Sequence, residues 1–332
     1  MFVVRELDSS DFAAISRYLA TYPMLPHAEY GVDAKKLVDA TMANLETRVK
    51  TPGKTLYGLT RDDGSIMGIA GGEYLYWDTK HFGYETGRID PCWIAPDTPD
   101  AAALMLLEET ASELDERGLE TYFTRISSHC LSAVRAAEAL AFSLADTVVE
   151  YVFDFAKTKI PEQKTDLQFR LAEPGDRDEL VELTRHTFSK YLGRFHKDPH
   201  YLEDRATEMY VKWMDNSLKG EMAEGVLLGI AEGKIAGFLT LKLLHDHDDV
   251  LGVRLGEGVL AGVAPFARGR GVYGDIIHNS LYWFSERTDK VKVVTQVNNY
   301  AVQNAWTKLG FRLRNAYHTF HYWRENGQES DE

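Results

Sequence analysis

The sequence has few cysteines and no long apolar run. Its 332 residues include two cysteines, Cys92 and Cys130, which form no CxxC pair. Two isolated cysteines cannot make a disulfide framework, which favours a reducing compartment. No run approaches the ~18 apolar residues of a membrane span, and the charged start MFVVRELDSSDF is unlike a secretion signal. We therefore expect a cytoplasmic protein that does not contact membranes.

Positive charge is also scarce. The chain has 37 Lys and Arg residues against 51 Asp and Glu residues, a net charge of -14. Such a surface repels nucleic acid at long range, so nucleic acid is not an expected partner and any anion site depends on local geometry. Hydrophobic residues make up 44% and charged residues 27%, as in ordinary globular proteins. At roughly 150 residues per domain, this length suggests two domains.

Two stretches of the chain repeat one α/β pattern. Near the first start Arg5 and Asp11 stand six positions apart, as Arg170 and Asp176 do near the second. In both places a short β-rich run precedes a helix with apolar residues at helical spacing. The repeat predicts two modules of the same fold.

The two copies also end alike, and a polar segment separates them. Residues 138–155 and 307–323 each read as the end of a helix, then a small residue and Phe, then a β-rich run. Segment 157–166 is polar and broken by Pro161, as a linker would be. We predict domains at 1–156 and 167–324, followed by an acidic tail at 325–332.

The stretch LAGVAPFARGRGVYGDII, residues 260–277, reads as strand, glycine turn and helix. A helix N-terminus has unpaired amide N–H groups and a partial positive charge, and glycines let the backbone close around a phosphate. Neither the GxGxxG pattern of dinucleotide sites nor the GxxxxGK[ST] pattern of P-loops is present. The expected ligand is a pyrophosphate, although the same glycines are compatible with a plain turn.

This stretch resembles the central motif of the GNAT acetyltransferase superfamily, [Q/R]xxGx[G/A] after a strand. The matching residues and the glycine that follows them are Val263, Ala264, Pro265, Arg268, Gly269, Arg270, Gly271, Val272, Tyr273 and Gly274. The resemblance implies that the amides from Arg268 to Gly274 bind the pyrophosphate of acetyl-CoA, or of another acyl-CoA, as co-substrate. It also implies that an N–H near Gly262 or Val263 polarises the thioester carbonyl. Tyr273 occupies the last position of the motif, where Gly or Ala is usual.

A second motif, NNYAVQNAWTKLGF at residues 298–311, is similar to the family's NxxAxxLYxKxGF element. Asn299 suits a helix N-cap and Gly310 a left-handed C-cap. By the resemblance, Asn299 and Trp306 line the cofactor site. Trp306 stands where many members carry a Tyr that protonates the leaving thiolate, and indole has no ionisable proton to give. The identity of the general acid is therefore open.

The first module is predicted to be a degenerate copy. Its equivalent of the anion loop, WIAPDTPDAAALMLLEE at residues 93–109, has neither an arginine nor a glycine turn. Asp97 and Asp100 stand at the start of the following helix, where carboxylates repel a phosphate. Cys130 and Ala137 take the places of Asn299 and Trp306. We expect this module to keep the fold without a CoA site.

Glu257 is the candidate general base, because it falls on the strand position where related enzymes carry a catalytic Glu. The alternatives are a salt-bridge partner at this position and deprotonation of the amine through water. His245, in the segment HDHDD at 245–249, is a second candidate base; a solvated turn is the alternative. Adjacent ligands on one short loop rarely converge on an ion, so no metal is predicted.

Two further stretches resemble nucleotide-amino-sugar N-acyltransferases, the group that includes TDP-fucosamine acetyltransferases. Trp77 and His81 lie in LYWDTKHFGYETGRID, and Arg194, His196 and Lys197 lie beside Phe195 and Tyr201 in the stretch 185–218. These five residues are the candidates for binding a nucleotide diphosphate whose base stacks on an aromatic ring. A packed strand edge or domain interface and an amphipathic helix pair are the respective alternatives.

Together these features predict an α/β protein with mixed sheets, made of two tandem GNAT domains of which the first is degenerate. The predicted activity is direct transfer of an acetyl or short acyl group from acyl-CoA to the amine of a small molecule, a dTDP-linked amino sugar in the first instance. The alternatives are a small amine or amino-acid conjugate as acceptor and a CoA-binding module without activity. A monomer and a homodimer are both compatible with the sequence.

Overall fold

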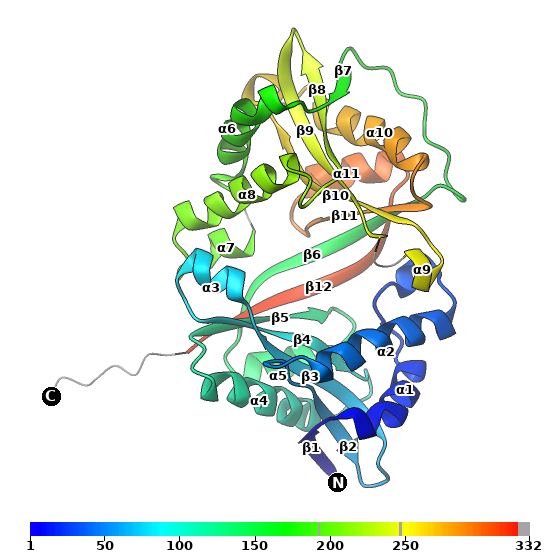
Figure 1. Ribbon diagram of the computed structural model, residues 1–332, viewed down its shortest axis with the longest axis vertical. Helices are drawn as coiled ribbons and strands as arrows, with labels where there is room; N and C mark the ends of the chain where they lie inside the picture. Colours follow the sequence, from blue (N-terminus) through cyan, green and yellow to red (C-terminus); the bar gives the residue numbers. More distant parts are fainter. Residues whose placement is uncertain (192, 246–247, 325–332) are drawn as a thin grey trace, which may run out of the picture. The chain divides into compact units, whose positions relative to one another are not determined.

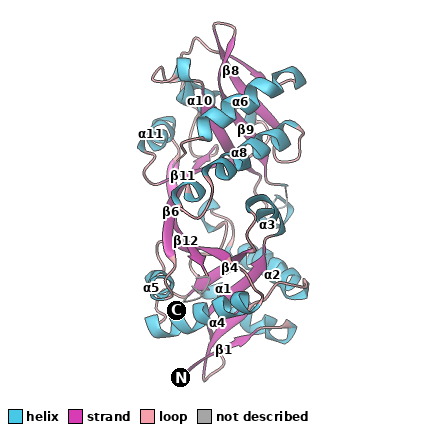
Figure 2. Ribbon diagram, turned by 90° about the vertical axis from the view of Figure 1, so that its left-hand side faces the viewer, coloured by secondary structure: helices cyan, strands magenta, loops and turns pink. Residues whose placement is uncertain are grey.

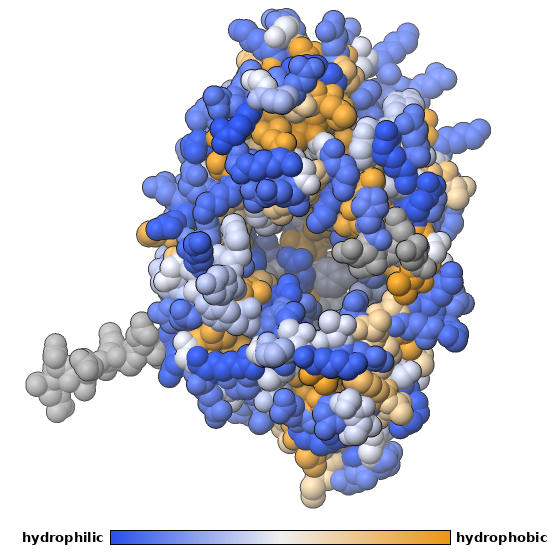
Figure 3. All heavy atoms as spheres, in the orientation of Figure 1, coloured by the Kyte–Doolittle hydropathy of each residue, from blue (hydrophilic) through white to orange (hydrophobic). Residues whose placement is uncertain are grey.

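The computed structural model describes residues 1–191, 193–245 and 248–324 (Figure 1). Within-chain contacts divide it into two compact units, one formed by Met1–Thr147 with the segment from Ala316 onward, the other by Val148–Asn315. The predicted acidic tail and residues 246 and 247 lie outside the described residues. No helix in the described ranges is long and apolar enough to cross a membrane. Hydrophilic side chains cover most of the face drawn in Figure 3, as the net charge of -14 leads one to expect.

Unit 1 has a mixed sheet in the order β1-β2-β3-β4-β5-β12. Its hydrophobic core packs α4 against β3, around residues such as Leu106, Leu107 and Ile94 that are inaccessible to solvent. Its strands are β1 (Phe2–Glu6), β2 (Tyr57–Arg61), β3 (Ile66–Tyr74), β4 (Thr86–Ile94), β5 (Thr121–Ser127) and β12 (Arg312–Trp323), and its helices are α1 (Phe12–Thr21), α2 (Ala34–Lys50), α3 (Tyr76–Phe82), α4 (Asp100–Glu116) and α5 (Leu131–Ala139).

Unit 2 has a mixed sheet in the order β6-β11-β10-β9-β8-β7. Figures 1 and 2 show α6 and α8 against one face of this sheet and α10 and α11 against the other. Its strands are β6 (Ser143–Asp154), β7 (Gln168–Leu171), β8 (Gly225–Ala231), β9 (Lys234–Leu243), β10 (Leu255–Val263) and β11 (Lys290–Gln296), and its helices are α6 (Arg177–Phe188), α7 (Arg194–Lys197), α8 (Glu203–Leu218), α9 (Asp248–Leu251), α10 (Val272–Ser285) and α11 (Tyr300–Leu309).

Helix α10 illustrates how the sequence dictates packing in unit 2. Apolar residues recur at helical spacing, and Ile276, Leu281 and Phe284 are buried against the sheet. Each such side chain stabilises the fold by about 1.5–3 kcal/mol through removal from water. The sheet makes room for them: a Cβ on Gly256 of β10 would lie 2.6 Å from Phe284 Cδ1. This contact also identifies the face of β10 that Gly256 shares with α10.

The closing strands of the two copies are exchanged between the units. Strand β6 ends the first copy in the sequence but pairs antiparallel with β11 of unit 2. Strand β12 ends the second copy but pairs antiparallel with β5 of unit 1. The compact units thus divide the chain differently from the predicted ranges 1–156 and 167–324, which describe the repeat in the sequence. A repeat shows where a strand lies along the chain and does not show which sheet it joins.

The repeat itself is regular. Strands β4, β5 and β6 correspond to β10, β11 and β12, each beginning 169 positions before its counterpart. The Arg–Asp landmarks also agree, since Arg5 binds both oxygens of Asp11 and Arg170 binds both oxygens of Asp176. Each pair joins a first strand to the helical turn that follows it. The structure therefore confirms two copies of one fold.

The segment predicted as a linker is exposed but attached to α10. Asp275, in the first turn of α10, accepts hydrogen bonds from the side chains of Gln163 and Thr165. The buried ring of His278 contacts the carbonyl oxygen of Pro161 through Nε2 at 2.7 Å. These contacts fix the course of residues 161–165 beside the helix that carries the predicted anion site.

Candidate functional site

The parallel strands β10 and β11 pair over a short distance and then separate. Their register runs from Leu255 opposite Lys290 to Gly258 opposite Val293 and ends there, although β10 continues to Val263. We call the part beyond Gly258 and Val293 the strand opening, and this last pair its apex. Unpaired strand edges carry free N–H and C=O groups that can hydrogen-bond an extended ligand.

A bulge in β10 aims particular backbone groups into the strand opening. The register with β9 shifts between Gly258 and Ala261. Beyond the bulge Ala264 N donates to Ala236 O at 2.8 Å. Because hydrogen-bonded positions alternate along an antiparallel ladder, Gly262 also turns its N–H and C=O toward β9, whereas Val263 turns its own away from β9. Of the two residues predicted to polarise the thioester, Val263 has the suitable backbone direction.

The predicted anion loop directly follows β10. Gly269 and Gly271 adopt left-handed conformations with φ of 75° and 80°, and Gly271 is the N-cap of α10. A Cβ on Gly269, Gly271 or Gly274 would meet nothing within 4 Å, so the space before this backbone is open. Among the described residues, no acceptor takes a hydrogen bond from the amides of Gly269 to Gly274. We call these six amides the amide nest. Open, unpaired N–H groups at a helix N-terminus fit a pyrophosphate.

Charged side chains around the amide nest leave it accessible. Arg268 Nε lies 3.4 Å from the carbonyl oxygen of Val263, and Arg270 makes a long ion pair of 3.7 Å with Glu232. The acidic group of the first helical turn, Asp275, is turned to the linker instead of the nest. The local charge before the nest is therefore positive, in a protein of strongly negative net charge.

Glu257 lies one position before the apex. Since side chains alternate between the faces of a strand, Glu257 points to the face opposite Gly256, that is, the face covered by α6 and α8. Its carboxylate forms an ion pair with Lys292 of β11 at 3.5 Å, with about one fifth of each side chain exposed. A carboxylate at this position can accept a proton from an amine that enters on this face.

Trp306 and Asn299 both lie on α11 or at its start, as the second motif predicts. Asn299 occupies the N-cap position, but its side chain donates to Thr295 Oγ1 at 2.9 Å instead of capping the helix. Trp306 is buried, and its indole Nε1 has no hydrogen-bond partner that meets normal geometry in the described part of the chain.

The equivalent opening in unit 1 is occupied by the protein itself. Strands β4 and β5 also separate, after Ile89 opposite Thr124. Here the carbonyl oxygen of Ile89 accepts from Thr124 Oγ1 at 3.0 Å, and that of Ile94 accepts from Cys130 Sγ at 3.3 Å. Ile94 and Cys130 are the counterparts of Val263 and Asn299. In the first copy, side chains thus hydrogen-bond the carbonyl oxygens of Ile89 and Ile94. The backbone groups of the equivalent residues in the second copy, Gly258 and Val263, border the strand opening.

The helix that follows β4 lacks an anion nest. Its N-cap is Pro99, which has no N–H, and Asp100 brings a carboxylate into the first turn. Asp100 is paired with Arg135 at 3.0 Å. These features support the prediction that the first copy has no CoA site.

Position 88 in the first copy, the counterpart of Glu257, is an arginine. Arg88 pairs with the buried Glu73, which also contacts Lys54 at 2.7 Å and Arg48 at 3.6 Å. Burial alone would raise the pKa of Glu73, but Lys54, Arg88 and Arg48 together hold it below its ordinary value. Where the second copy has Glu257, the first copy therefore has a structural cluster of charges, which the sequence analysis did not identify. The exchange of Glu for Arg at aligned positions is the signal that reveals it.

The cluster of basic side chains predicted to bind the acceptor carries less positive charge than its sequence suggests. Arg194 lies over the ring of Phe195, 4.2 Å from its centroid, and Lys197 is exposed. His196 is turned inward, and burial lowers its pKa, so it adds no positive charge at neutral pH. Its Nε2 lies 3.2 Å from Thr207 Oγ1, and its Nδ1 has no hydrogen-bond partner within the described ranges. Arg194, His196 and Lys197 remain candidates for the acceptor site.

The aromatic rings predicted to stack on a nucleotide base are part of the core. Phe195 and Tyr201 are buried and pack edge to face at 5.1 Å. The expectation that they stack on a ligand was wrong, because their faces already contact protein. A nucleotide base can stack only on an aromatic ring whose face is exposed to solvent.

The other candidate residues, Trp77, His81 and His245, belong to segments of the chain outside β10, β11 and the loop that follows β10. In unit 1, Trp77 stacks on the buried His81 with ring centroids 4.8 Å apart, and about two fifths of Trp77 is exposed. In unit 2, His245 lies 3.9 Å from Glu224 with an exposed side chain. Neither arrangement tests the predicted roles. Over the described residues, no three His, Cys, Asp or Glu side chains converge as metal ligands would.

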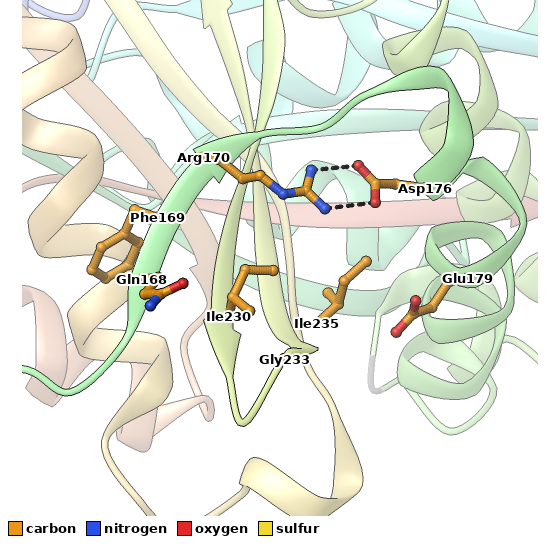
Figure 4. A pocket seen from close by; sticks show the side chains of 8 residues that line it. All are labelled: Gln168, Phe169, Arg170, Asp176, Glu179, Ile230, Gly233 and Ile235. Atoms are coloured by element: carbon orange, nitrogen blue, oxygen red, sulfur yellow. Dashed lines mark hydrogen bonds and ion pairs between the residues drawn. The ribbon is translucent and has the colours of Figure 1, made fainter.

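A polar hollow at the edge of the unit 2 sheet is distinct from the strand opening. Gln168 and Phe169 of β7 and Glu179 of α6 line it (Figure 4). Arg170 on its wall is held by both oxygens of Asp176, so its charge is neutralised within the protein.

Comparison with known proteins adds to this geometry. No family model matches the chain. The spore coat polysaccharide biosynthesis protein SpsD of Bacillus subtilis is 28% identical over 154 residues, 46% of this chain and about half (49%) of that protein. A dTDP-fucosamine acetyltransferase of Escherichia coli is 23% identical over 241 residues, 72% of this chain and 92% of that protein.

Solved structures decide the fold. A GCN5-related N-acetyltransferase from Sphaerobacter thermophilus superposes with a TM-score of 0.62 at 15% identity, over 97% of this chain and 95% of that one. A tandem GNAT protein of the clavulanic acid pathway superposes with a TM-score of 0.54 at 10% identity, over 97% and 98%. The chain has the tandem GNAT fold. The GNAT resemblance predicted from the motifs is thus confirmed for the whole architecture.

Proposed function

We propose that unit 2 binds an acyl-CoA and transfers its acyl group directly to the amine of a small molecule. The observation that carries this proposal is the amide nest, whose six N–H groups have no acceptor in the described part of the chain and follow a strand separated from its parallel neighbour. The open space before Gly269, Gly271 and Gly274 accommodates a pyrophosphate close to the backbone. The GNAT fold of unit 2 agrees with such a ligand.

The strand opening supplies a path for the extended arm of the coenzyme. A ligand held at the nest reaches the opening at the end where β10 terminates, and an arm with amide groups can hydrogen-bond the free edge of β10 as an added strand. The thioester then lies in the opening between Val263 and the apex, and the backbone N–H of Val263, at the end of β10, is turned to polarise its carbonyl. No side chain is required for this polarisation.

Glu257 lies one position before the apex and six before Val263, and it receives the proton of the attacking amine through water. The amine lone pair forms the C–N bond, the C–S bond breaks, and the electron pair stays on sulfur. The ion pair with Lys292 at 3.5 Å holds the Glu257 carboxylate in place on this face. The transfer needs no covalent enzyme intermediate. Both cysteines are buried, and burial raises the pKa of Cys92 to about 12, which makes it a poor nucleophile.

We further propose a nucleotide-linked amino sugar, such as a dTDP-amino sugar, as the acceptor. Support comes from the name of the dTDP-fucosamine acetyltransferase, with which the chain shares 23% identity, and from Arg194 and Lys197 as groups for a diphosphate. A thiol-release assay tests this with acetyl-CoA and a panel of dTDP- and UDP-amino sugars, the free amino sugars and amino-acid amines. Turnover that requires the diphosphate supports the acceptor class; equal turnover with the free sugars would leave a small amine as the substrate. Binding of acetyl-CoA without turnover on any amine would identify a CoA-binding module instead.

A further inference from the structure

Helix α6 brings the side chain of Thr187 against the part of β10 that borders the strand opening. A Cβ on Gly262 would lie 2.9 Å from Thr187 Oγ1 and 2.6 Å from Phe238 Cε1, so the hydroxyl lies directly against the glycine backbone. Helix α6 packs against β10, and Phe238 is the partner of Gly262 on β9. Because Val263 is the next residue of β10, the hydroxyl lies beside the N–H that is expected to polarise the thioester.

The Thr187 hydroxyl has no hydrogen-bond partner among the described residues, although its oxygen is buried. A threonine hydroxyl in a helix can donate to the carbonyl oxygen four positions earlier, as Thr184 does to Leu180 at 2.7 Å. Thr187 is on the same helix and makes no such bond. Buried polar groups in folded proteins are nearly always paired, and Thr187 as a whole is partly exposed. Its hydroxyl is therefore suited to a partner that a ligand supplies.

The side chains of Glu257 and Thr187 share one face of the unit 2 sheet. Glu257 points to the face covered by α6 and α8, and a Cβ on Gly262 would point to Thr187 of α6. Along β10, however, Glu257 precedes Gly262 by five positions, which is roughly 15 Å at about 3.3 Å per residue. An amine that attacks a carbonyl held by the N–H of Val263 is therefore too far from Glu257 for a direct hydrogen bond. A nearer polar group is needed to hold the nitrogen in line with the carbonyl carbon.

We propose that the Thr187 hydroxyl accepts a hydrogen bond from the attacking amine and orients the nitrogen lone pair toward the thioester carbonyl. This inference rests on the proposed acyl transfer. The nitrogen lone pair forms the C–N bond, the electron pair of the C–S bond stays on sulfur, and the amine proton leaves through water to Glu257. Thr187 forms no covalent bond and keeps its own proton. A primary amine suits this arrangement, because one N–H binds the hydroxyl while the other faces water.

The test is steady-state kinetics of Thr187→Val, which removes the hydroxyl and keeps the shape of the side chain. With acetyl-CoA and the most active amine of the panel above, we expect kcat/KM for the amine to fall about 10- to 30-fold, because the bond that orients the nucleophile is lost. The calorimetric Kd for acetyl-CoA should change less than about twofold. The Tm should not fall, since valine leaves no unpaired polar atom at this position. Thr187→Ser, which keeps a hydroxyl, should retain at least about half of the wild-type kcat/KM.

Thr184→Val is the matched control, because it removes a buried hydroxyl of the same helix that is already bound to Leu180. We expect it to keep the wild-type kcat/KM. Wild-type kinetics in Thr187→Val would overturn the inference and leave the proposed function intact. A loss of Tm or of acetyl-CoA affinity in Thr187→Val, or an equal loss of activity in Thr187→Ser, would show a structural role and also overturn it. A wild-type protein that is inactive on every amine of the panel removes the proposed function and the inference together.

Discussion

Replacing Gly274 by aspartate separates the stability of α10 from the function of the amide nest. Gly274 is the third residue of the helix, its φ is not left-handed, and a Cβ there would meet nothing within 4 Å. Loss of glycine from a helix contributes about 0.5 kcal/mol of stability, and a carboxylate in the first turn contributes about 0.3–1 kcal/mol through the helix dipole. Gly274→Asp should therefore be about 1 kcal/mol more stable than the wild type, a rise in Tm of about 2–4 °C.

The same carboxylate should weaken acyl-CoA binding. At about 5 Å and an effective dielectric constant of about 40, each negative charge of the pyrophosphate is repelled by about 1.7 kcal/mol, so two charges cost about 3 kcal/mol and raise Kd roughly 100-fold. Isothermal titration calorimetry with acetyl-CoA at fixed ionic strength measures this, with Gly274→Asn as the uncharged control of similar size. Equal affinity in the aspartate and asparagine variants would refute the assignment of the nest, because shape alone would then account for any loss.

Three further substitutions address the remaining roles. Arg268→Glu should raise the KM for acetyl-CoA at least about 10-fold by repulsion of the phosphates; an unchanged KM in steady-state assays would count against the site. Glu257→Gln should lower kcat about 100-fold with little change in donor Kd, and wild-type rates across pH would remove Glu257 from the mechanism. Glu73→Gln should destabilise unit 1 by about 3 kcal/mol, because Arg48 loses a buried partner. Since the folded-state pKa of Glu73 is below its ordinary 4.5, its contribution is present above pH 4.5 and is lost as pH falls through the folded pKa. Urea unfolding at several pH values should therefore show less acid dependence in Glu73→Gln than in the wild type, and parallel curves would contradict this.

Local patterns in the sequence were sufficient to predict the repeated fold and the glycine turn before α10. Glycines at 269 and 271 have left-handed φ values as a close backbone approach requires, and the apolar spacing of 276–284 faces the core. The repeat was visible because each module needs the same Arg–Asp pair after its first strand. These features depend on residues close in the chain, where spacing determines geometry.

Features that depend on distant residues could not be predicted in the same way. The exchange of β6 and β12 between the units leaves no trace in the periodicity of either strand. The inward turn of His196 follows from packing of α7 against α8, and the burial of Phe195 and Tyr201 has the same origin. The burial of Trp306 beside Tyr151 joins α11 to β6, whose sequences give no sign of each other. In each case a tertiary contact decides the role of the side chain.

The most direct test of the account is a crystal structure of the protein with acetyl-CoA. We predict pyrophosphate oxygens within hydrogen-bond distance of backbone nitrogens between Gly269 and Gly274, with the thioester near the backbone N–H of Val263. A pyrophosphate bound elsewhere, for example at the start of α4 in the first copy, would contradict the central claim.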